Sequence, residues 1–107
     1  MALDTKTAER VRRYLGARDD VVEKRMVGGL SFMVGGRMCC GVTSTGLMVR
    51  LGRDGASAAL GEPHVRPLEL GGKPIDAFVV IDPSGHAGDA ALACWLDRAL
   101  AFVASET

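Results

Sequence analysis

The stretch that decides the fold runs from residue 30 to residue 51 and reads LSFMVGGRMCCGVTSTGLMVRL. From Leu30 to Val34 every second residue is a large apolar one, which predicts a strand with one buried face. The glycine pair at 35–36 is typical of a tight hairpin turn, because glycine tolerates a positive φ. The chain then returns along residues 37–42 and alternates again through residues 47–51. This pattern predicts an antiparallel meander.

Periodic segments on both sides of the meander predict further elements. Apolar residues at helical spacing indicate helices, and a short apolar run between turn residues indicates a strand. The elements predicted outside the meander are helices over residues 5–15, 54–60 and 87–104 and strands over residues 65–70 and 75–81. Because Pro67 interrupts the first of these two strands, we expect that strand at an edge of the sheet.

These elements predict one α+β domain over residues 1–107. We expect two layers, a mainly antiparallel sheet of five to six strands with the helices packed on one face. The order is a helix, three or four strands, a helix, two strands and a final helix. A chain of 107 residues with 48 % hydrophobic residues can bury a core of its own.

Composition limits the classes of function. The 13 basic and 13 acidic residues balance, whereas a dedicated nucleic-acid binder usually carries a basic excess, so direct nucleic-acid binding is not expected. No apolar run approaches the ~20 residues of a membrane span, and charged residues interrupt the N-terminus where a signal peptide would need an apolar core. Three cysteines without framework spacing suggest reduced thiols. We therefore expect a cytoplasmic protein without a membrane partner.

No group of residues predicts catalysis, a cofactor or a metal site. Ser84, His86 and Asp89 are close in sequence, but nucleophilic catalysis needs such residues oriented in space, which consecutive turn residues seldom achieve. The segment from Asp82 to Gly85 has the composition of a type I turn, which explains Asp82, Pro83 and Gly85 without chemistry. The glycine pairs lie between strands and do not precede a helix, so no phosphate-binding loop results. We predict no catalytic, cofactor-binding or metal-binding residues.

Cys39 and Cys40 are neighbours in a predicted strand. Successive side chains in a strand point to opposite faces, so we expect the two thiols on opposite sides of the sheet. Buried or half-buried thiols are the simplest interpretation, and a redox-sensitive thiol is the alternative. The two histidines are expected at the surface or in loops.

The first helix carries a basic face. Lys6, Arg10 and Arg13 recur at helical spacing and could contact a phosphate backbone. Glu9 interrupts the face and no aromatic side chain accompanies it, so a solvated surface is the favoured interpretation.

One run resembles a known family. Residues 23–34 read EKRMVGGLSFMV, and the similarity continues through residues 36–42. This run resembles the N-terminal domain of TfoX/Sxy proteins, whose pattern is similar to K-x-M-F-G-G-x-x-F followed by a hairpin. Further similarity lies at residues 47–50, 72–74 and 78–79 and in the last helix, which contains Trp95. Val27 departs from the family pattern, which has Phe, and we expect that change to alter packing only.

The resemblance implies a bacterial, regulatory domain with the mixed or antiparallel fold described above. It supplies no established catalytic residues. Full-length competence regulators add a C-terminal helical domain, whereas this chain ends at Thr107, soon after its last predicted helix. We therefore expect a stand-alone domain of the N-terminal type.

The sequence favours a non-catalytic regulatory or protein-interaction domain, with another protein or a second copy of the chain as partner. The first alternative is a binder of small anionic ligands, or an enzyme, that uses the sheet face with Arg25, Arg37 or Arg50 at its rim. The second is weak nucleic-acid binding by the basic first helix. The candidate interaction surface comprises Arg25, Met26, Gly28, Gly29, Phe32 and Arg37.

Overall fold

The computed structural model describes residues 5–16, 18–26, 29–44 and 46–106 of the chain. Its helices are α1 (Thr5–Leu15), α2 (Gly52–Ala59) and α3 (Asp89–Ser105), with a short 3₁₀ turn η1 (Pro83–Gly85) before α3. Its strands are β1 (Val21–Met26), β2 (Gly29–Val34), β3 (Arg37–Thr43), β4 (Leu47–Arg50), β5 (Val65–Leu70) and β6 (Lys73–Ile81).

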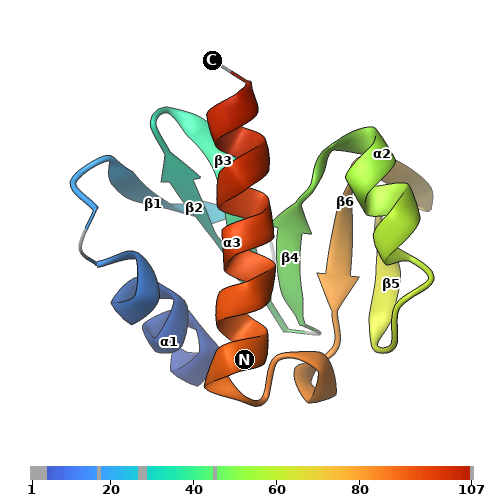
Figure 1. Cartoon of the computed structure of the whole chain (residues 1–107), viewed down its shortest axis with the longest axis horizontal. Coiled ribbons are helices and arrows are strands. Elements are labelled where there is room, and N and C mark those ends of the chain that lie inside the picture. The colour runs from blue at the N-terminus through green and yellow to red at the C-terminus, as the bar shows by residue number, and fades with distance from the viewer. Residues whose placement is uncertain (1–4, 17, 27–28, 45, 107) are drawn as a thin grey trace.

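The strands form one antiparallel sheet in the order β1-β2-β3-β4-β6-β5. The helices pack on one face of this sheet, with α3 across its centre (Figure 1). The predicted α+β class and two-layer architecture are confirmed. Four strands precede α2, because residues 21–26 form a separate strand beside the meander.

Alternation along the strands builds the core. The large apolar side chains of β2, which include the fully buried Phe32, face α1 and α3. From α1 the core receives Ala8, Val11 and Leu15 at helical spacing. Burying a side chain of the size of Val11 or Leu15 stabilises the fold by roughly 1.5–3 kcal/mol, so the stripe on α1 fixes this helix to the sheet.

The hairpin between β2 and β3 forms as the glycine pair predicts. Gly35 has φ +60° and Gly36 has φ +83°, both in the left-handed region that favours glycine. Val34 and Arg37 therefore pair directly on either side of a two-residue turn. The expected edge position of β5 is also confirmed, since β5 ends the strand order and pairs with β6.

A β-bulge in β3 changes the direction of one side chain. Phe32 pairs with Cys40 and Met33 pairs with Met38, so Cys39 is an extra residue on β3. Both cysteines belong to the core cluster and neither is exposed. The prediction that their thiols lie on opposite faces of the sheet is wrong, because the bulge breaks the two-residue alternation at this point.

Candidate interaction surface

The residues of the candidate interaction surface lie along β2 and its two neighbours. Arg25 pairs with Leu30 at one end of β2, whereas Arg37 pairs with Val34 at the other end. The two arginines are both exposed, but the length of β2 separates them. The structure therefore does not bring them together into one anion site.

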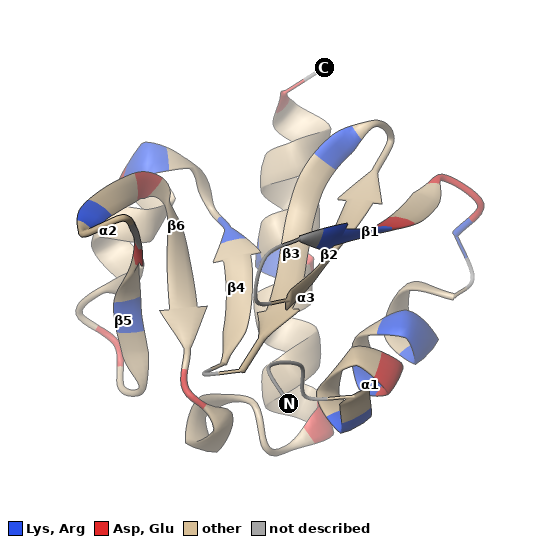
Figure 2. Cartoon of the chain, turned by 180° about the vertical axis from the view of Figure 1, so that it is seen from behind, with Lys and Arg blue, Asp and Glu red and all other residues tan. Residues whose placement is uncertain are grey.

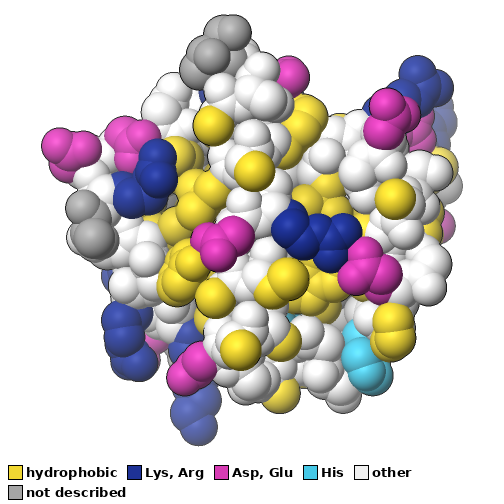
Figure 3. Space-filling view, viewed as in Figure 1, with side chains coloured by type: hydrophobic (Ala, Val, Ile, Leu, Met, Phe, Trp, Pro, Cys, Tyr) yellow, Lys and Arg dark blue, Asp and Glu magenta, His cyan; other side chains and the backbone are white. Residues whose placement is uncertain are grey.

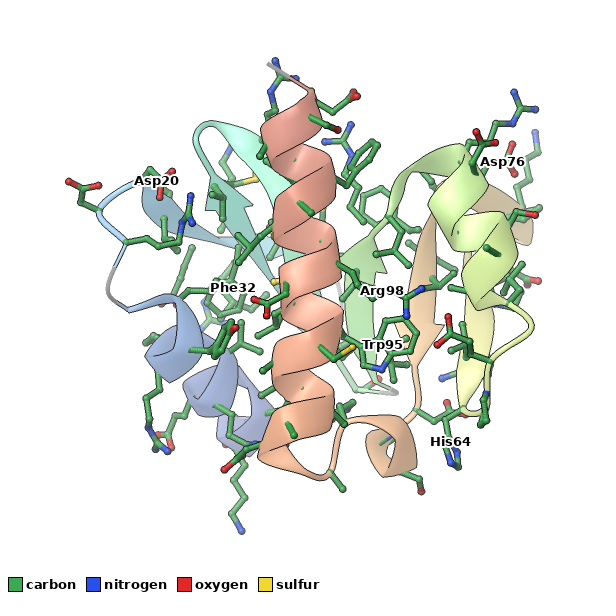
Figure 4. All side chains as sticks on the ribbon, viewed as in Figure 1. Asp20, Phe32, His64, Asp76, Trp95 and Arg98 are labelled. Carbon is green, nitrogen blue, oxygen red and sulfur yellow. The ribbon has the colours of Figure 1, made fainter. Side chains whose placement is uncertain are left out.

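Two members of the candidate surface have a structural role. Phe32 is fully buried beneath the helices and has no surface to offer a partner; Figure 4 shows it between α1 and α3. Including it in the surface was wrong, because the β2 alternation turns it into the core. Gly29 is packed against β3, where an added Cβ would lie 2.4 Å from the carbonyl oxygen of Val42. Gly28 and the side chain of Met26 lie outside the described part of the chain.

The surface around Arg25 is a cleft between α1 and β1. It has a volume of about 400 Å³, and Leu30 forms an apolar part of its lining. Arg12 of α1 donates two hydrogen bonds to Glu23 of β1, at 2.5 and 2.8 Å. The hydrogen bond from Arg12 lowers the pKa of the Glu23 carboxyl, although partial burial opposes this. Since no ion pair involving Arg25 is found within the described residues, its positive charge remains available to a partner.

Strand β1 presents one free edge of the sheet. The amide of Gly35 donates to the carbonyl of Asp20 at 2.9 Å. This bond shows which alternate residues of β1 direct their backbone groups toward β2. By the alternation of an antiparallel ladder, the backbone groups of Val21, Glu23 and Arg25 point away from the sheet. Val22 is 58 % exposed, more than any other large apolar side chain in the described residues.

A second cleft lies where the β2–β3 hairpin meets the end of α3. It has a volume of about 240 Å³, with Val34, Leu100 and Val103 as apolar lining and Arg18 and Arg37 among its polar residues. Arg18 is engaged with Asp20, whose carboxyl accepts hydrogen bonds at 3.1 and 3.2 Å. This hydrogen bonding lowers the pKa of the Asp20 carboxyl.

The basic face of α1 is partly neutralised. Arg10 donates to the carbonyl oxygen of Ala87 at 3.2 Å and to Asp89 at 3.3 Å, at the start of α3. Arg13 is exposed and lines a shallow cleft of about 340 Å³ with Arg10. Lys6 is also exposed. The structure thus uses Arg10 to join α1 to α3, and the three cations do not act as a uniform phosphate-binding row.

The cysteine pair is a feature of the core. A hydrogen bond with Cys40 lowers the pKa of the Cys39 thiol, with burial acting in the opposite sense and Arg18 assisting the lowering. The same hydrogen bond and burial raise the pKa of the Cys40 thiol. Cys94 is exposed on α3 and is the accessible thiol among the three.

The residues of the turn before α3 do not assemble a nucleophilic site. Asp82 accepts a hydrogen bond from Arg66 and Asp89 one from Arg10, so both carboxylates are engaged by arginine. Ser84 is exposed, whereas His86 is 3 % exposed. Both histidines lie in loops, as expected; His64 is exposed, whereas the loop of His86 packs inward and buries its side chain. Within the described residues no three potential metal ligands lie together.

On the helical side, charged groups are held in place by specific contacts. Arg98 lies 4.2 Å from the centre of the Trp95 ring and donates two hydrogen bonds to Glu62 (Figure 4). This arrangement ties α3 to the segment after α2. Apolar side chains remain visible between α3 and its neighbours, with charged groups dispersed among them (Figure 3). Basic side chains gather at the lower left, over α1, with an acidic group among them.

Comparison with known families decides the classification. Residues 13–103 match the family model of the TfoX N-terminal domain. The chain belongs to this family. Searches among curated proteins and among solved structures gave no match.

The match to the TfoX N-terminal domain includes all six strands, α2 and nearly all of α3, but only the end of α1. The cleft residues Arg18, Arg25 and Arg37 therefore lie within the family region. Lys6 and Arg10 lie outside it, so the family match gives the basic face of α1 no support. None of the described helices is long and apolar enough to cross a bilayer.

Sequence reasoning missed the exposed part of β1. Val22 and the acidic pair before it, Asp19 and Asp20, were not among the candidate residues. The signal was present, because two aspartates precede a pair of valines and two cations follow them within seven residues. That order of charges matters because β1 is an edge strand, where the charged side chains can face a partner.

Proposed function

We propose that this TfoX N-terminal domain is a non-catalytic regulatory domain that binds a protein partner through the surface around β1. The observation that carries the proposal is the free edge of β1, with Val22 58 % exposed and Arg25 available beside the cleft at α1. An exposed apolar side chain next to cations and unpaired strand backbone is typical of a surface that another protein covers.

The charges in the surface support a protein partner over a nucleic acid. The β1 segment carries acidic as well as basic residues (Figure 2), and a phosphate backbone would be repelled by Glu23 and the aspartates before it. A protein edge with alternating charges can complement both signs.

Affinity capture with matched variants tests this function. The tagged domain, its Arg25→Glu variant and its Arg53→Glu variant are used as baits in lysate of the source organism, and captured proteins are quantified by mass spectrometry. Arg53 is an exposed arginine on α2, at the other end of the sheet, and serves as the control. We expect the captured amount of at least one protein other than the domain itself to fall by about tenfold with Arg25→Glu and to stay unchanged with Arg53→Glu. The reason is that Arg25→Glu removes a cation from the interface.

Two outcomes count against the proposal. If both variants lose the captured proteins equally, or if none is enriched, the surface around β1 has no partner role. A reproducible catalytic turnover by the purified domain that one polar substitution abolishes would contradict the non-catalytic assignment.

The hairpin cleft supports a second candidate function, the binding of a small anion with an apolar tail. Arg37 is exposed at its rim, and Val34, Leu100 and Val103 supply an apolar lining. A short fatty acid such as hexanoate would place its carboxylate at Arg37. Titration calorimetry should then detect binding that Arg37→Ala removes and Arg53→Ala leaves unchanged, and equal heats for the three proteins would refute it.

A further inference from the structure

The two edges of the sheet differ in their capacity to accept another strand. The amide of Asp82 donates to the carbonyl of His64 at 2.8 Å, which fixes the phase between β5 and β6 and directs the backbone of Pro67 outward. Proline has no N–H, so β5 lacks a donor in the middle of its free edge. At the β1 edge, Val21, Glu23 and Arg25 all retain both backbone groups. β1 is therefore the edge that can extend the sheet.

The charges of the segment around β1 complement those of a second copy of the same segment that runs antiparallel to it. Residues 19–25 read Asp-Asp-Val-Val-Glu-Lys-Arg, with acids at one end, cations at the other and Val22 at the centre. Figure 2 shows this order at the edge of the molecule, where the loop before β1 is acidic and the strand ends in basic residues. An antiparallel second copy places the opposite end of the same segment against each charge.

We propose that two copies of the chain associate through β1, antiparallel, about a twofold axis at Val22, so that their sheets become one. This inference deepens the interaction role proposed above and rests on it. In this register Val22 faces Val22 of the other copy. Asp20, whose carbonyl accepts from Gly35 at the start of the ladder, faces Lys24, and Asp19, in the bend before β1, comes to the side of Arg25. The twofold axis generates each of these contacts twice.

The backbone phase agrees with this register. Val21 and Glu23 both have outward-pointing N–H and C=O groups, and the register sets Val21 of one copy opposite Glu23 of the other as a hydrogen-bonded pair. Val22 then occupies the non-hydrogen-bonded position, where side chains approach most closely. That position suits an exposed valine, whose burial on both copies would remove the most exposed large apolar side chain from water.

Neighbouring registers are worse. A shift that centres the axis on Glu23 sets the two glutamates against each other and leaves no oppositely charged pair in the strand. A shift that centres it on Lys24 pairs Glu23 with Arg25 but sets the two lysines directly opposite. Like charges directly opposite in a sheet are destabilising, so charge favours the register at Val22.

Existing contacts leave the required groups accessible. Asp19, Lys24 and Arg25 are exposed and have no ion pair within the described residues. Asp20 binds Arg18 but keeps 39 % of its side chain exposed, enough to face a second cation. Exposed ion pairs add little affinity and are screened by salt, so they set the register while backbone pairing and Val22 hold the copies together. The dimer should depend on protein concentration and weaken as salt rises.

Sedimentation velocity of the whole chain, from about 10 µM to about 1 mM, measures the association directly. We expect a concentration-dependent dimer that Val22→Lys abolishes, because this substitution sets two ammonium groups at the axis. Glu69→Lys, an exposed change on the β5 edge, is the matched control and should leave the dimer intact.

A charge-swap pair tests the register. The acidic copy carries Lys24→Glu and Arg25→Glu, and the basic copy carries Asp19→Lys and Asp20→Lys. Each alone should be monomeric, since every cross-strand pair becomes repulsive, whereas a mixture of the two should form a heterodimer. Circular dichroism of each copy confirms that the substitutions leave the fold unchanged.

Three results would overturn the inference. They are a monomeric wild-type chain over the whole concentration range, a dimer that survives Val22→Lys, and a charge-swap mixture that fails to associate. A monomer would refute the self-association only, because the capture experiment could still identify a different protein that binds at β1. If the capture experiment enriches no other protein while the dimer is intact, the wider partner function is refuted and the self-association stands.

Discussion

Gly29 provides the sharpest test of how the family-specific stretch builds the fold. The sequence places this glycine in a pair that lies between two predicted strands. In the structure it is the first residue of β2, and an added Cβ would lie 2.4 Å from the carbonyl oxygen of Val42 and 3.4 Å from the Cα of Thr43. Both neighbours are backbone atoms, so the overlap cannot be relieved by a side-chain rotation. The close approach of β3 is what requires glycine here.

The expected cost of Gly29→Ala follows from that overlap. Forcing an extra methyl group into a packed site typically costs about 1–3 kcal/mol. Separating β2 from β3 also weakens a backbone hydrogen bond, worth about 0.5–1.5 kcal/mol. We therefore expect a loss of roughly 2–4 kcal/mol in the free energy of unfolding, a large share of the ~5–15 kcal/mol of an ordinary domain.

Urea unfolding followed by circular dichroism measures this loss. With a slope of about 1–3 kcal/mol per molar, the midpoint should fall by roughly 1–3 M. Gly61→Ala is the control, since its added Cβ has no atom nearer than the carbonyl oxygen of Ala58 at 3.7 Å. That change should be neutral or stabilise by up to about 1 kcal/mol. A Gly29→Ala variant within about 0.5 kcal/mol of wild type would refute the reasoning.

Two further predictions concern the thiols and the contact between α1 and β1. Among the three thiols, we expect Ellman's reagent to modify only Cys94 rapidly in the folded chain, with Cys39 and Cys40 reacting after unfolding in urea; three fast thiols would contradict their burial. Arg12 lowers the pKa of Glu23, so their pair contributes stability that is present above the unfolded carboxyl pKa of about 4.3 and is lost as pH falls through the lower folded pKa. The Arg12→Met variant should therefore be less stable than wild type at neutral pH and equal to it in strong acid, as measured by urea unfolding at both pH values; a difference that persists in acid would show that the pair is not the cause.

Much of the candidate site was not predictable from residues alone. Arg25 and Arg37 are only twelve positions apart in sequence, yet they lie at opposite ends of β2. Phe32 has an apolar side chain in the family-specific run, and sequence similarity does not distinguish a buried aromatic from an exposed one. In both cases the missing information was the pairing partner of each strand, which is a property of residues far along the chain.

What the sequence determined by itself was local. The alternation from Leu30 to Val34, the glycine pair that follows and the apolar stripe of α1 depend on periodicity and on φ preferences, both of which are local to a few residues. They were enough to predict the α+β class, the hairpin and the elements, and the family resemblance at residues 23–42 agreed with them. The edge position of β5 was also predictable, because proline lacks a backbone donor.

What only the tertiary structure decided was the relation between distant segments. The bulge that turns Cys39 into the core depends on the registers of β2 and β3, and the free edge of β1 depends on which strands β4 and β6 accept as neighbours. The same charges at residues 19–25 would be an ordinary solvated segment in a central strand. They form a self-complementary edge because β1 is last in the strand order, where the outward backbone groups of Val21, Glu23 and Arg25 have no strand partner within the described chain.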